Sequence, residues 1–257
     1  MVQRPALFAR SMSLLLAAAV SVLITGLSIP RAAWAAPPAE EARAVAGFEA
    51  VVLEGSGRVK VELAERESVR LSGSAKALAA TETVLETRDG VPTLVIRRKG
   101  SGWGSWWGSW GSSSNADVQV AVQGPRFRAL AVAGSGEIDA RLSNQPALRL
   151  SMAGSGDLRV SGVTTHSAEV NVAGSGDVRV KGAVQTLTVS VAGSGDAWLQ
   201  EFEAEDVRVS VAGSGDARVN ARQRLRASVA GSGDIRYTGP AKDVSHSSVG
   251  SGRLVRE

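Results

Sequence analysis

The chain has 257 residues with 29 basic and 25 acidic side chains, a formal net charge of +4 and no cysteine. The absence of cysteine excludes disulfides, thiolate catalysis and cysteine-based metal sites, so packing has to stabilise the fold. Three arginines lie in the first 35 residues, and the remaining 26 basic and 25 acidic residues leave a net charge of +1, which gives no support for nucleic-acid binding.

Residues 1–35 have the organisation of a secretory signal peptide. Two arginines supply a positive start, residues 11–29 are uncharged and largely apolar, and Ala33-Trp34-Ala35 is a small-residue cleavage site. The apolar stretch is short for a membrane span, so we expect cleavage after Ala35 and no stable span afterwards. The alternative is an uncleaved membrane anchor. Cleavage would leave an exported protein in the periplasm or at the cell surface, with residues 36–46 as a linker.

Residues 47–99 begin the folded part of the chain, which we expect to form a single domain over residues 47–257. They contain a Gly-Ser-Gly motif at Gly55–Gly57, and the regular series of such motifs begins 79 residues later at Gly134. That distance leaves room for about four coils of a degenerate repeat. We therefore expect residues 47–99 to form irregular N-terminal coils.

Residues 100–115 are rich in glycine, serine and tryptophan, a composition typical of a loop rather than a buried strand. Exposed tryptophan suggests contact with sugar rings, a membrane interface or a protein, which makes this segment a candidate ligand site. The alternative is that it caps one end of the fold. The four indoles concerned belong to Trp103, Trp106, Trp107 and Trp110.

Residues 116–257 carry a regular repeat in which Gly-Ser-Gly recurs every 18 to 20 residues. Apolar residues occur two, four and six positions before each motif and four and six positions after its first glycine, with polar residues between them. A period of two predicts half-buried strands, and glycine allows the positive φ and the close approach that a corner needs. The motifs begin at Gly134, Gly154, Gly174, Gly193, Gly213, Gly231 and Gly250.

These units are too small to fold singly. About five apolar side chains, worth on the order of 2 kcal/mol each on burial, do not offset the ordering of some twenty residues at roughly 1–2 kcal/mol apiece. Neighbouring units have to supply backbone hydrogen bonds and a continuous core. The pattern therefore predicts an all-β fold, a right-handed parallel β-helix built from repeats of about twenty residues. A β-prism or sandwich is the alternative.

The repeated Val-x-Val-Ala-Gly-Ser-Gly-Asp unit and the lead-in at residues 47–57 resemble the head GIN domain family of auto-transporter adhesins, a domain of unknown function. The resemblance covers residues 47–255. It implies a β-helix-like fold and a location in the cell envelope, and it offers no catalytic residues to carry over.

Stacking would align equivalent residues of successive coils into columns, which offer further candidate sites. One column consists of the acid that follows each corner, and a second column, mostly arginine, lies two residues further along the chain. The two columns together predict a solvated charged face. The alternative is a ladder of calcium sites along the acids. A small polar column three residues before each corner either binds an extended sugar or simply allows close stacking. The three columns are Glu137, Asp157, Asp177, Asp196, Asp216 and Asp234; Asp139, Arg159, Arg179, Trp198, Arg218 and Arg236; and Ser151, Asn171, Ser190, Ser210 and Ser228.

No catalytic motif accompanies the repeat. His166 and His246 fall at different phases, and neither a nucleophile elbow nor a phosphate loop is present. We expect a non-enzymatic, adhesin-like envelope protein without cofactor or metal, which binds a glycan or an envelope protein through an exposed face or the tryptophan-rich segment. The alternatives are a structural spacer of the periplasm and, less favoured, a polysaccharide-acting β-helix enzyme.

Overall fold

The computed structural model describes residues 39–100 and 118–257. These residues form one short helix and 17 strands that share a single sheet. The elements are β1 (Ala39–Arg43), β2 (Ala50–Gly55), β3 (Arg58–Leu63), β4 (Ser68–Gly73), α1 (Ala75–Ala80), β5 (Thr81–Arg88), β6 (Val91–Arg98), β7 (Gln119–Gly124), β8 (Ala129–Gly134), β9 (Glu137–Arg141), β10 (Asn144–Gly154), β11 (Asp157–Gly174), β12 (Asp177–Gly193), β13 (Ala197–Gly213), β14 (Ala217–Gly231), β15 (Ile235–Thr238), β16 (Asp243–Gly250) and β17 (Leu254–Arg256).

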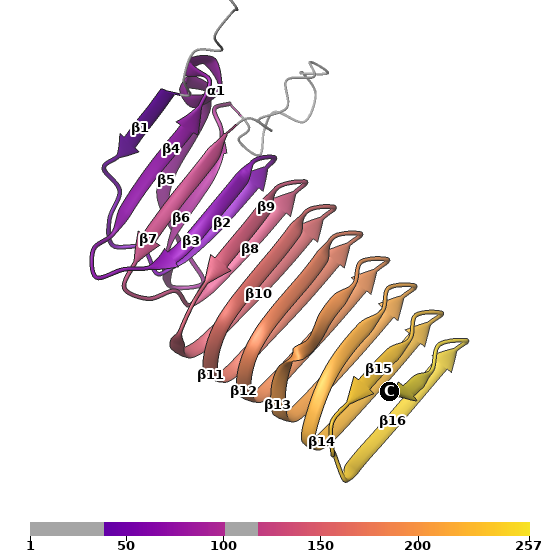
Figure 1. Cartoon of the computed structure of the whole chain (residues 1–257). Coiled ribbons are helices and arrows are strands. Elements are labelled where there is room, and N and C mark those ends of the chain that lie inside the picture. The colour runs from indigo at the N-terminus through magenta and orange to yellow at the C-terminus, as the bar shows by residue number, and fades with distance from the viewer. Residues whose placement is uncertain (1–38, 101–117) are drawn as a thin grey trace, which may run out of the picture. The chain divides into compact units, whose positions relative to one another are not determined.

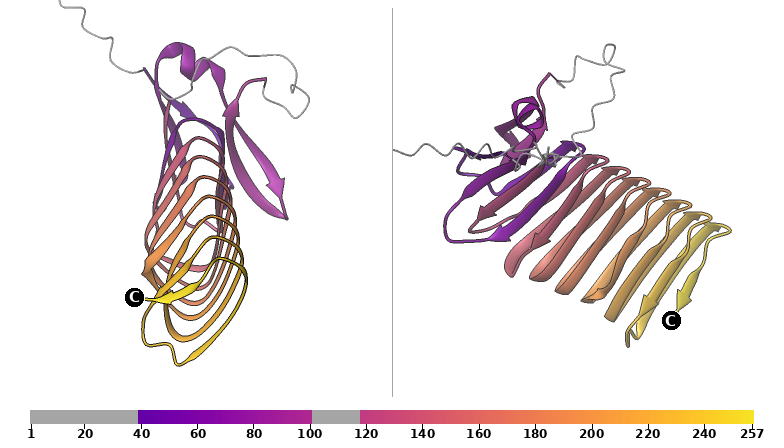
Figure 2. Two further views of the ribbon diagram at one scale, coloured as in Figure 1. Left: turned by 90° about the vertical axis from the view of Figure 1, so that its right-hand side faces the viewer. Right: turned by 45° about the horizontal axis from the view of Figure 1, so that its top comes forward.

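From β8 to β16 the chain is a stack of parallel coils, which confirms the predicted β-solenoid (Figure 1). Viewed along the stack, the coils superimpose as flattened rings (Figure 2, left). Equivalent glycines are in register from coil to coil, as Gly154 with Gly174 and Gly174 with Gly193. The apolar positions of the repeat point inward and form one continuous core, with Leu150 and Val170 fully buried.

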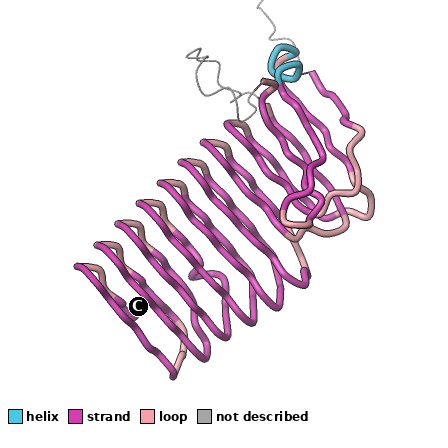
Figure 3. Tube along the Cα trace, turned by 180° about the vertical axis from the view of Figure 1, so that it is seen from behind, coloured by secondary structure: helices cyan, strands magenta, loops and turns pink. Residues whose placement is uncertain are grey.

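Each Gly-Ser-Gly of the regular repeat is a sharp corner at one edge of the coil, as expected (Figure 3). The first glycine has a positive φ, +124° at Gly154 and +116° at Gly174. Its carbonyl oxygen accepts hydrogen bonds from the next corner: Ser175 N and Gly176 N donate to Gly154 O at 2.8 and 3.0 Å. The corners are therefore bonded to one another along the stack.

The opposite edge of each coil is a rounded bend rather than a second corner, so β11 to β14 run on as strands of 15 to 18 residues. The hydrogen-bonded ladder skips one residue there: Gln145 pairs with Thr165 and Ala147 with Ser167, which leaves His166 outside the ladder. Alternation slips by one at this point, because His166 and Ser167 both face outward.

The N-terminal coils follow an order that the repeat spacing did not predict. The Gly55 corner stacks directly on the Gly134 corner, so the intervening residues do not form coils between the two. Instead β6 and β7 form a coil on the other side of β2 and β3. The coil of β6 and β7 therefore follows that of β2 and β3 in the sequence but lies outside it in the stack. Residues 47–99 contribute to parallel coils, in an order that the spacing of the motifs did not predict.

Antiparallel strands cover this end of the stack. Strand β4 pairs with β7 and β5 pairs with β6, both antiparallel, and β1 extends the layer by pairing with β4. Helix α1 connects β4 to β5, and the Ser74 hydroxyl caps it by accepting a hydrogen bond from Ala77 N. Strand β1 lies in the segment 36–46 that the sequence indicated as a linker.

At the other end the inward positions lose their apolar character. Ala227 and Val229 of β14 are in register with His246 and Ser248 of β16. Both of these side chains are exposed, so the apolar core stops one coil before the last described strand pair. Polar residues at a solenoid end discourage unspecific edge association.

Candidate functional site

The stripe of acids and arginines beside the corners is an ion-pair network. Arg179 contacts Asp177 of its own coil at 2.9 Å and Asp157 of the preceding coil at 3.5 Å. Arg236 bridges Asp216 and Asp234 in the same way, at 2.9 and 3.2 Å. Each of these arginines therefore neutralises acids of two neighbouring coils.

The acids also stabilise the corners. Asp196 Oδ1 accepts a hydrogen bond from Asp216 N, and Asp216 Oδ1 accepts one from Asp234 N, both at 2.8 Å. Because carboxylate oxygens are occupied by arginine and by backbone N–H, they are poorly placed to hold a cation. Within residues 39–100 and 118–257, no group of three histidine or acidic side chains is arranged to hold a metal ion.

Trp198 takes the place of an arginine in this stripe. Its ring lies between two guanidinium groups of neighbouring coils, 4.0 Å from that of Arg218 and 5.6 Å from that of Arg179. Cations above and below an indole are attracted to its π faces. The column therefore remains continuous where an arginine is missing, and this tryptophan has a packing role.

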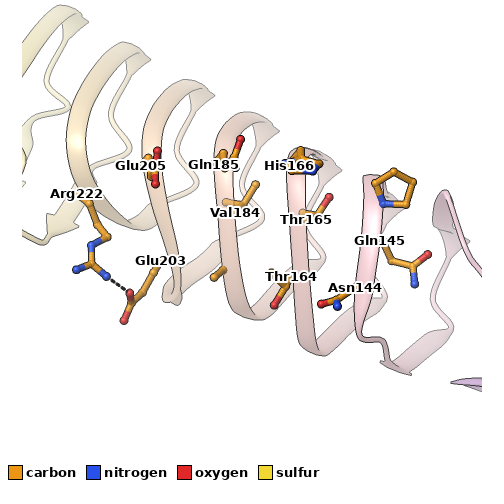
Figure 4. Close-up of a pocket in the computed structure, with 12 residues that line it drawn as sticks. Asn144, Gln145, Thr164, Thr165, His166, Val184, Gln185, Glu203, Glu205 and Arg222 are labelled. Carbon is orange, nitrogen blue, oxygen red and sulfur yellow. Dashed lines mark hydrogen bonds and ion pairs between the residues drawn. The ribbon is translucent and has the colours of Figure 1, made fainter.

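A groove of about 660 Å³ runs along the bend edge, across five consecutive coils from β10 to β14. Figure 4 shows its lining residues one coil after another, from Asn144 at one end to Arg222 at the other. Two outward columns border it, and a parallel stack of five coils spans about 19 Å. The columns consist of Asn144, Thr164, Ala183 and Glu203, and of Pro146, His166, Gln185 and Glu205.

The floor of the groove is rigid because its polar groups are already bonded. Gln145 and Thr165 are each only 5% exposed. Gln145 Oε1 accepts a hydrogen bond from Phe127 N at 3.1 Å, and the Thr165 hydroxyl donates to Ser167 O at 3.1 Å. At one end Arg222 pairs with Glu203 at 2.5 Å. The exposed amides and hydroxyls of the rim, by contrast, face solvent.

The four tryptophans singled out by the sequence, Trp103, Trp106, Trp107 and Trp110, lie outside the described residues. The strands on either side of them are described. Ile96 of β6 is in register with Leu53, and Gln119 of β7 with Arg58. In the neighbouring coil Leu53 and Arg58 flank the Gly55–Gly57 corner, so residues 97–118 stand in the sequence where that coil has its corner.

A family model described as "Putative auto-transporter adhesin, head GIN domain" matches residues 47–241. The chain belongs to this family. The match confirms the resemblance seen in the repeats and spans the corners from Gly55 to Gly233 and the whole bend groove. A comparison with curated protein sequences found no match.

Solved structures of similar fold cover most of the chain. A protein from Bacteroides fragilis described as a putative adhesin has a TM-score of 0.77 at 20% identity, over 87% of this chain and 98% of its own. A protein from Parabacteroides distasonis described as a putative lipid binding protein has a TM-score of 0.68 at 22% identity, over 86% and 97%. A putative adhesin from the same species has a TM-score of 0.63 at 20% identity, over 86% and 97%. At these identities the likeness establishes the solenoid fold alone.

The head GIN domain of this chain thus offers a bend groove that sequence reasoning missed. Its columns contain amides, hydroxyls, a proline and acids, so no single residue type marks them along the sequence. The only available signal was the slip in alternation beside His166, where two outward residues follow one another.

No helix among residues 39–100 and 118–257 is long and apolar enough to cross a membrane.

Proposed function

We propose that this head GIN domain is a non-enzymatic, exported envelope protein that binds an extended glycan along the bend groove. The observation that carries the proposal is the groove itself, which crosses five coils and presents equivalent positions of each. A polymer of similar sugar units can make the same contact with each coil, because each coil presents an equivalent set of side chains. The adhesin descriptions of the family and of its structural neighbours agree with a binding role.

The rim chemistry supports a sugar ligand. Asn144 and Gln185 offer amides and Thr164 a hydroxyl, groups that donate and accept hydrogen bonds as sugar hydroxyls do. Pro146 and His166 add ring faces between the polar groups. The buried floor beneath them supplies a preorganised surface, which lowers the entropic cost of binding.

The tryptophan-rich segment is a second candidate contact. A specific observation favours ligand binding over capping: β4 and β5 already cover the coil from which the segment emerges. A cap made by residues 100–115 would therefore be redundant at this end. We propose that Trp103, Trp106, Trp107 and Trp110 add sugar or protein contacts to those of the groove, and that residues 1–35 direct export.

A glycan array followed by titration calorimetry tests the groove. The informative variant is His166→Ala with Gln185→Ala, because His166 lies outside the backbone ladder and both side chains are exposed. Ser175→Ala with Ser194→Ala is the matched control, because both side chains are exposed and lie at the corners, on the edge of the coil opposite the bend. We expect the groove variant to weaken glycan binding at least tenfold and the control to change it less than twofold.

The remaining outcomes distinguish the alternatives. If the groove variant binds the glycan with unchanged affinity, the binding site lies elsewhere on the solenoid. Failure of the protein to bind any glycan or envelope protein would favour a structural spacer. Release of shortened sugar chains during the incubation would instead support a polysaccharide-acting enzyme.

A further inference from the structure

Two arginines on the outer face of the solenoid are stacked without a direct ion pair of their own. Arg208 of β13 is in register with Arg226 of β14, and both side chains are exposed. Neighbouring parallel strands lie about 4.8 Å apart, a distance at which like charges directly opposite each other are destabilising. Neither guanidinium has an ion pair or a hydrogen bond with any residue of the 39–100 and 118–257 ranges.

Other in-register arginine pairs on this solenoid are neutralised. Arg159 and Arg179 are also neighbours in register, beside the corners. Asp157 contacts both of them, at 3.3 and 3.5 Å, and Glu137 and Asp177 contact one each. Beside Arg208 and Arg226 the acid is Asp206, which lines the same pocket and attracts Arg226 at longer range, but both of its oxygens are bonded to Arg224.

The surroundings of the pair form a shallow pocket of about 260 Å³. The hydroxyl side chains of Thr186 and Thr188 line it from β12. Arg224 also lines it, but Asp206 holds this guanidinium through two hydrogen bonds of 2.7 and 2.5 Å, and Asp243 is in register on its other side. Arg224 is thus compensated and fixed in place.

We propose that Arg208 and Arg226 bind an anionic group, a carboxylate or sulfate, carried by an acidic glycan. The identity of the ligand as a glycan rests on the proposed function. Guanidinium groups bind such planar or tetrahedral anions with paired, charge-assisted hydrogen bonds, and Thr188 adds a hydroxyl in the same column as Arg208. An anion between the two arginines replaces their mutual repulsion with attraction.

The location favours a glycan over a membrane surface. The bend groove and this pocket share coils β12 to β14, and Arg222 of the groove is two residues before Arg224. A chain lying along the groove can therefore present a side group to the pocket. The neighbouring outward residues toward the corner, Ser210 and Ala212, are small and offer nothing to insert into lipid.

The test compares two double variants of the full chain. The first is Arg208→Thr with Arg226→Thr. Threonine is chosen because Thr188 of β12 occupies the equivalent position in the neighbouring coil. Arg159→Thr with Arg179→Thr removes the same charge from an equally stacked pair. Binding is measured on immobilised heparin and polygalacturonate, on neutral dextran, and on phosphatidylglycerol vesicles.

We expect the first double variant to lose at least tenfold in affinity for the acidic polysaccharides, and the control to lose less than twofold. Asp206→Asn, which removes a negative charge beside the pair, should strengthen the same binding. Without ligand, the first double variant should melt no lower than wild type, because it relieves a repulsion. A residue pair with only a structural role would show the opposite in the melting experiment.

Three results would overturn the inference. Equal losses in both double variants would mean unspecific charge attraction. Binding of wild type to neutral dextran but not to the acidic polymers would remove the anion site and leave the proposed glycan function in place. Binding to the vesicles alone would assign the pair to a lipid headgroup, against a glycan ligand.

Discussion

The carbonyl oxygen of Gly156 lies 2.4 Å from the position that a Cβ on Gly176 would occupy. Gly176 has no positive φ, unlike Gly174, so the two glycines of one corner are required for different reasons. Gly174→Ala meets both a strained φ of +116° and the Gly154 carbonyl, whereas Gly176→Ala meets only the neighbouring backbone and Met152.

Gly176→Ala should therefore destabilise the solenoid by about 1–3 kcal/mol through overpacking alone. Gly174→Ala should cost more, because strain at φ adds to the clash. Ser175→Ala is the control between them, since its side chain is exposed and such changes stay within about 0.5 kcal/mol. Urea unfolding measures all three; equal midpoints for Gly176→Ala and Ser175→Ala would refute close packing of the corners.

The regular coils could be predicted from the sequence because their pattern is local. Alternation places Val170 and Val172 inside, and the repeated motif places the corners, so stacking in register follows. The order of the N-terminal coils could not be predicted, because the return of β6 and β7 to β2 and β3 depends on pairing across a long insertion. The stacked pair Arg208 and Arg226 emerges only once the register is known.

The acids of the corner stripe should bind no calcium. Asp216 uses one oxygen for Asp234 N and the other for Arg236, so a cation would have to displace both. Addition of millimolar calcium, or of EDTA, should leave the melting temperature unchanged. A rise of many degrees with calcium alone would indicate a metal ladder, because a ligand that binds only the folded state stabilises it.

Asp216 should stabilise the corner through the hydrogen bond that its carboxylate accepts from Asp234 N. Asp216→Ala removes the acceptor of Asp234 N and is expected to lower the free energy of unfolding by about 1 kcal/mol. Asp216→Asn keeps an oxygen acceptor and should recover part of the loss. Asp139→Ala serves as a control on the same stripe. If Asp139→Ala and Asp216→Ala destabilise equally, the bond to Asp234 contributes nothing specific.

Asp206 should make a small pH-dependent contribution to stability. Hydrogen bonding from Arg224 lowers the pKa of this carboxyl below its ordinary value. A lowered folded-state pKa means that the contribution is present above the unfolded-state pKa, near 4, and is lost as the pH falls through the folded-state pKa. The midpoint difference between wild type and Asp206→Asn should be constant from pH 6 to 7 and shrink in acid, with Asp139→Asn as the control. A difference that grows below about pH 4 would reverse the assigned sign.

Deletion of residues 103–110 distinguishes the two proposed roles of the tryptophan-rich segment, ligand contact and capping of the stack. If the segment contacts a ligand, the deletion should leave the β-sheet circular dichroism and the melting temperature nearly unchanged, because β4 and β5 already cover this end of the stack. It should at the same time weaken binding to any glycan or protein that the full chain binds. A cap would give the reverse: a loss of several degrees and no specific binding defect.

Tryptophan fluorescence gives an early check that needs no ligand. The deletion removes Trp103, Trp106, Trp107 and Trp110 and leaves Trp198, whose ring lies between Arg179 and Arg218, as the indole of the solenoid. The difference between the two proteins is therefore the emission of the four segment indoles. A ligand-contacting segment in the free protein should give red-shifted emission that iodide quenches. Blue-shifted emission resistant to iodide would mean docked indoles, and together with a lowered melting temperature it would identify the segment as a cap.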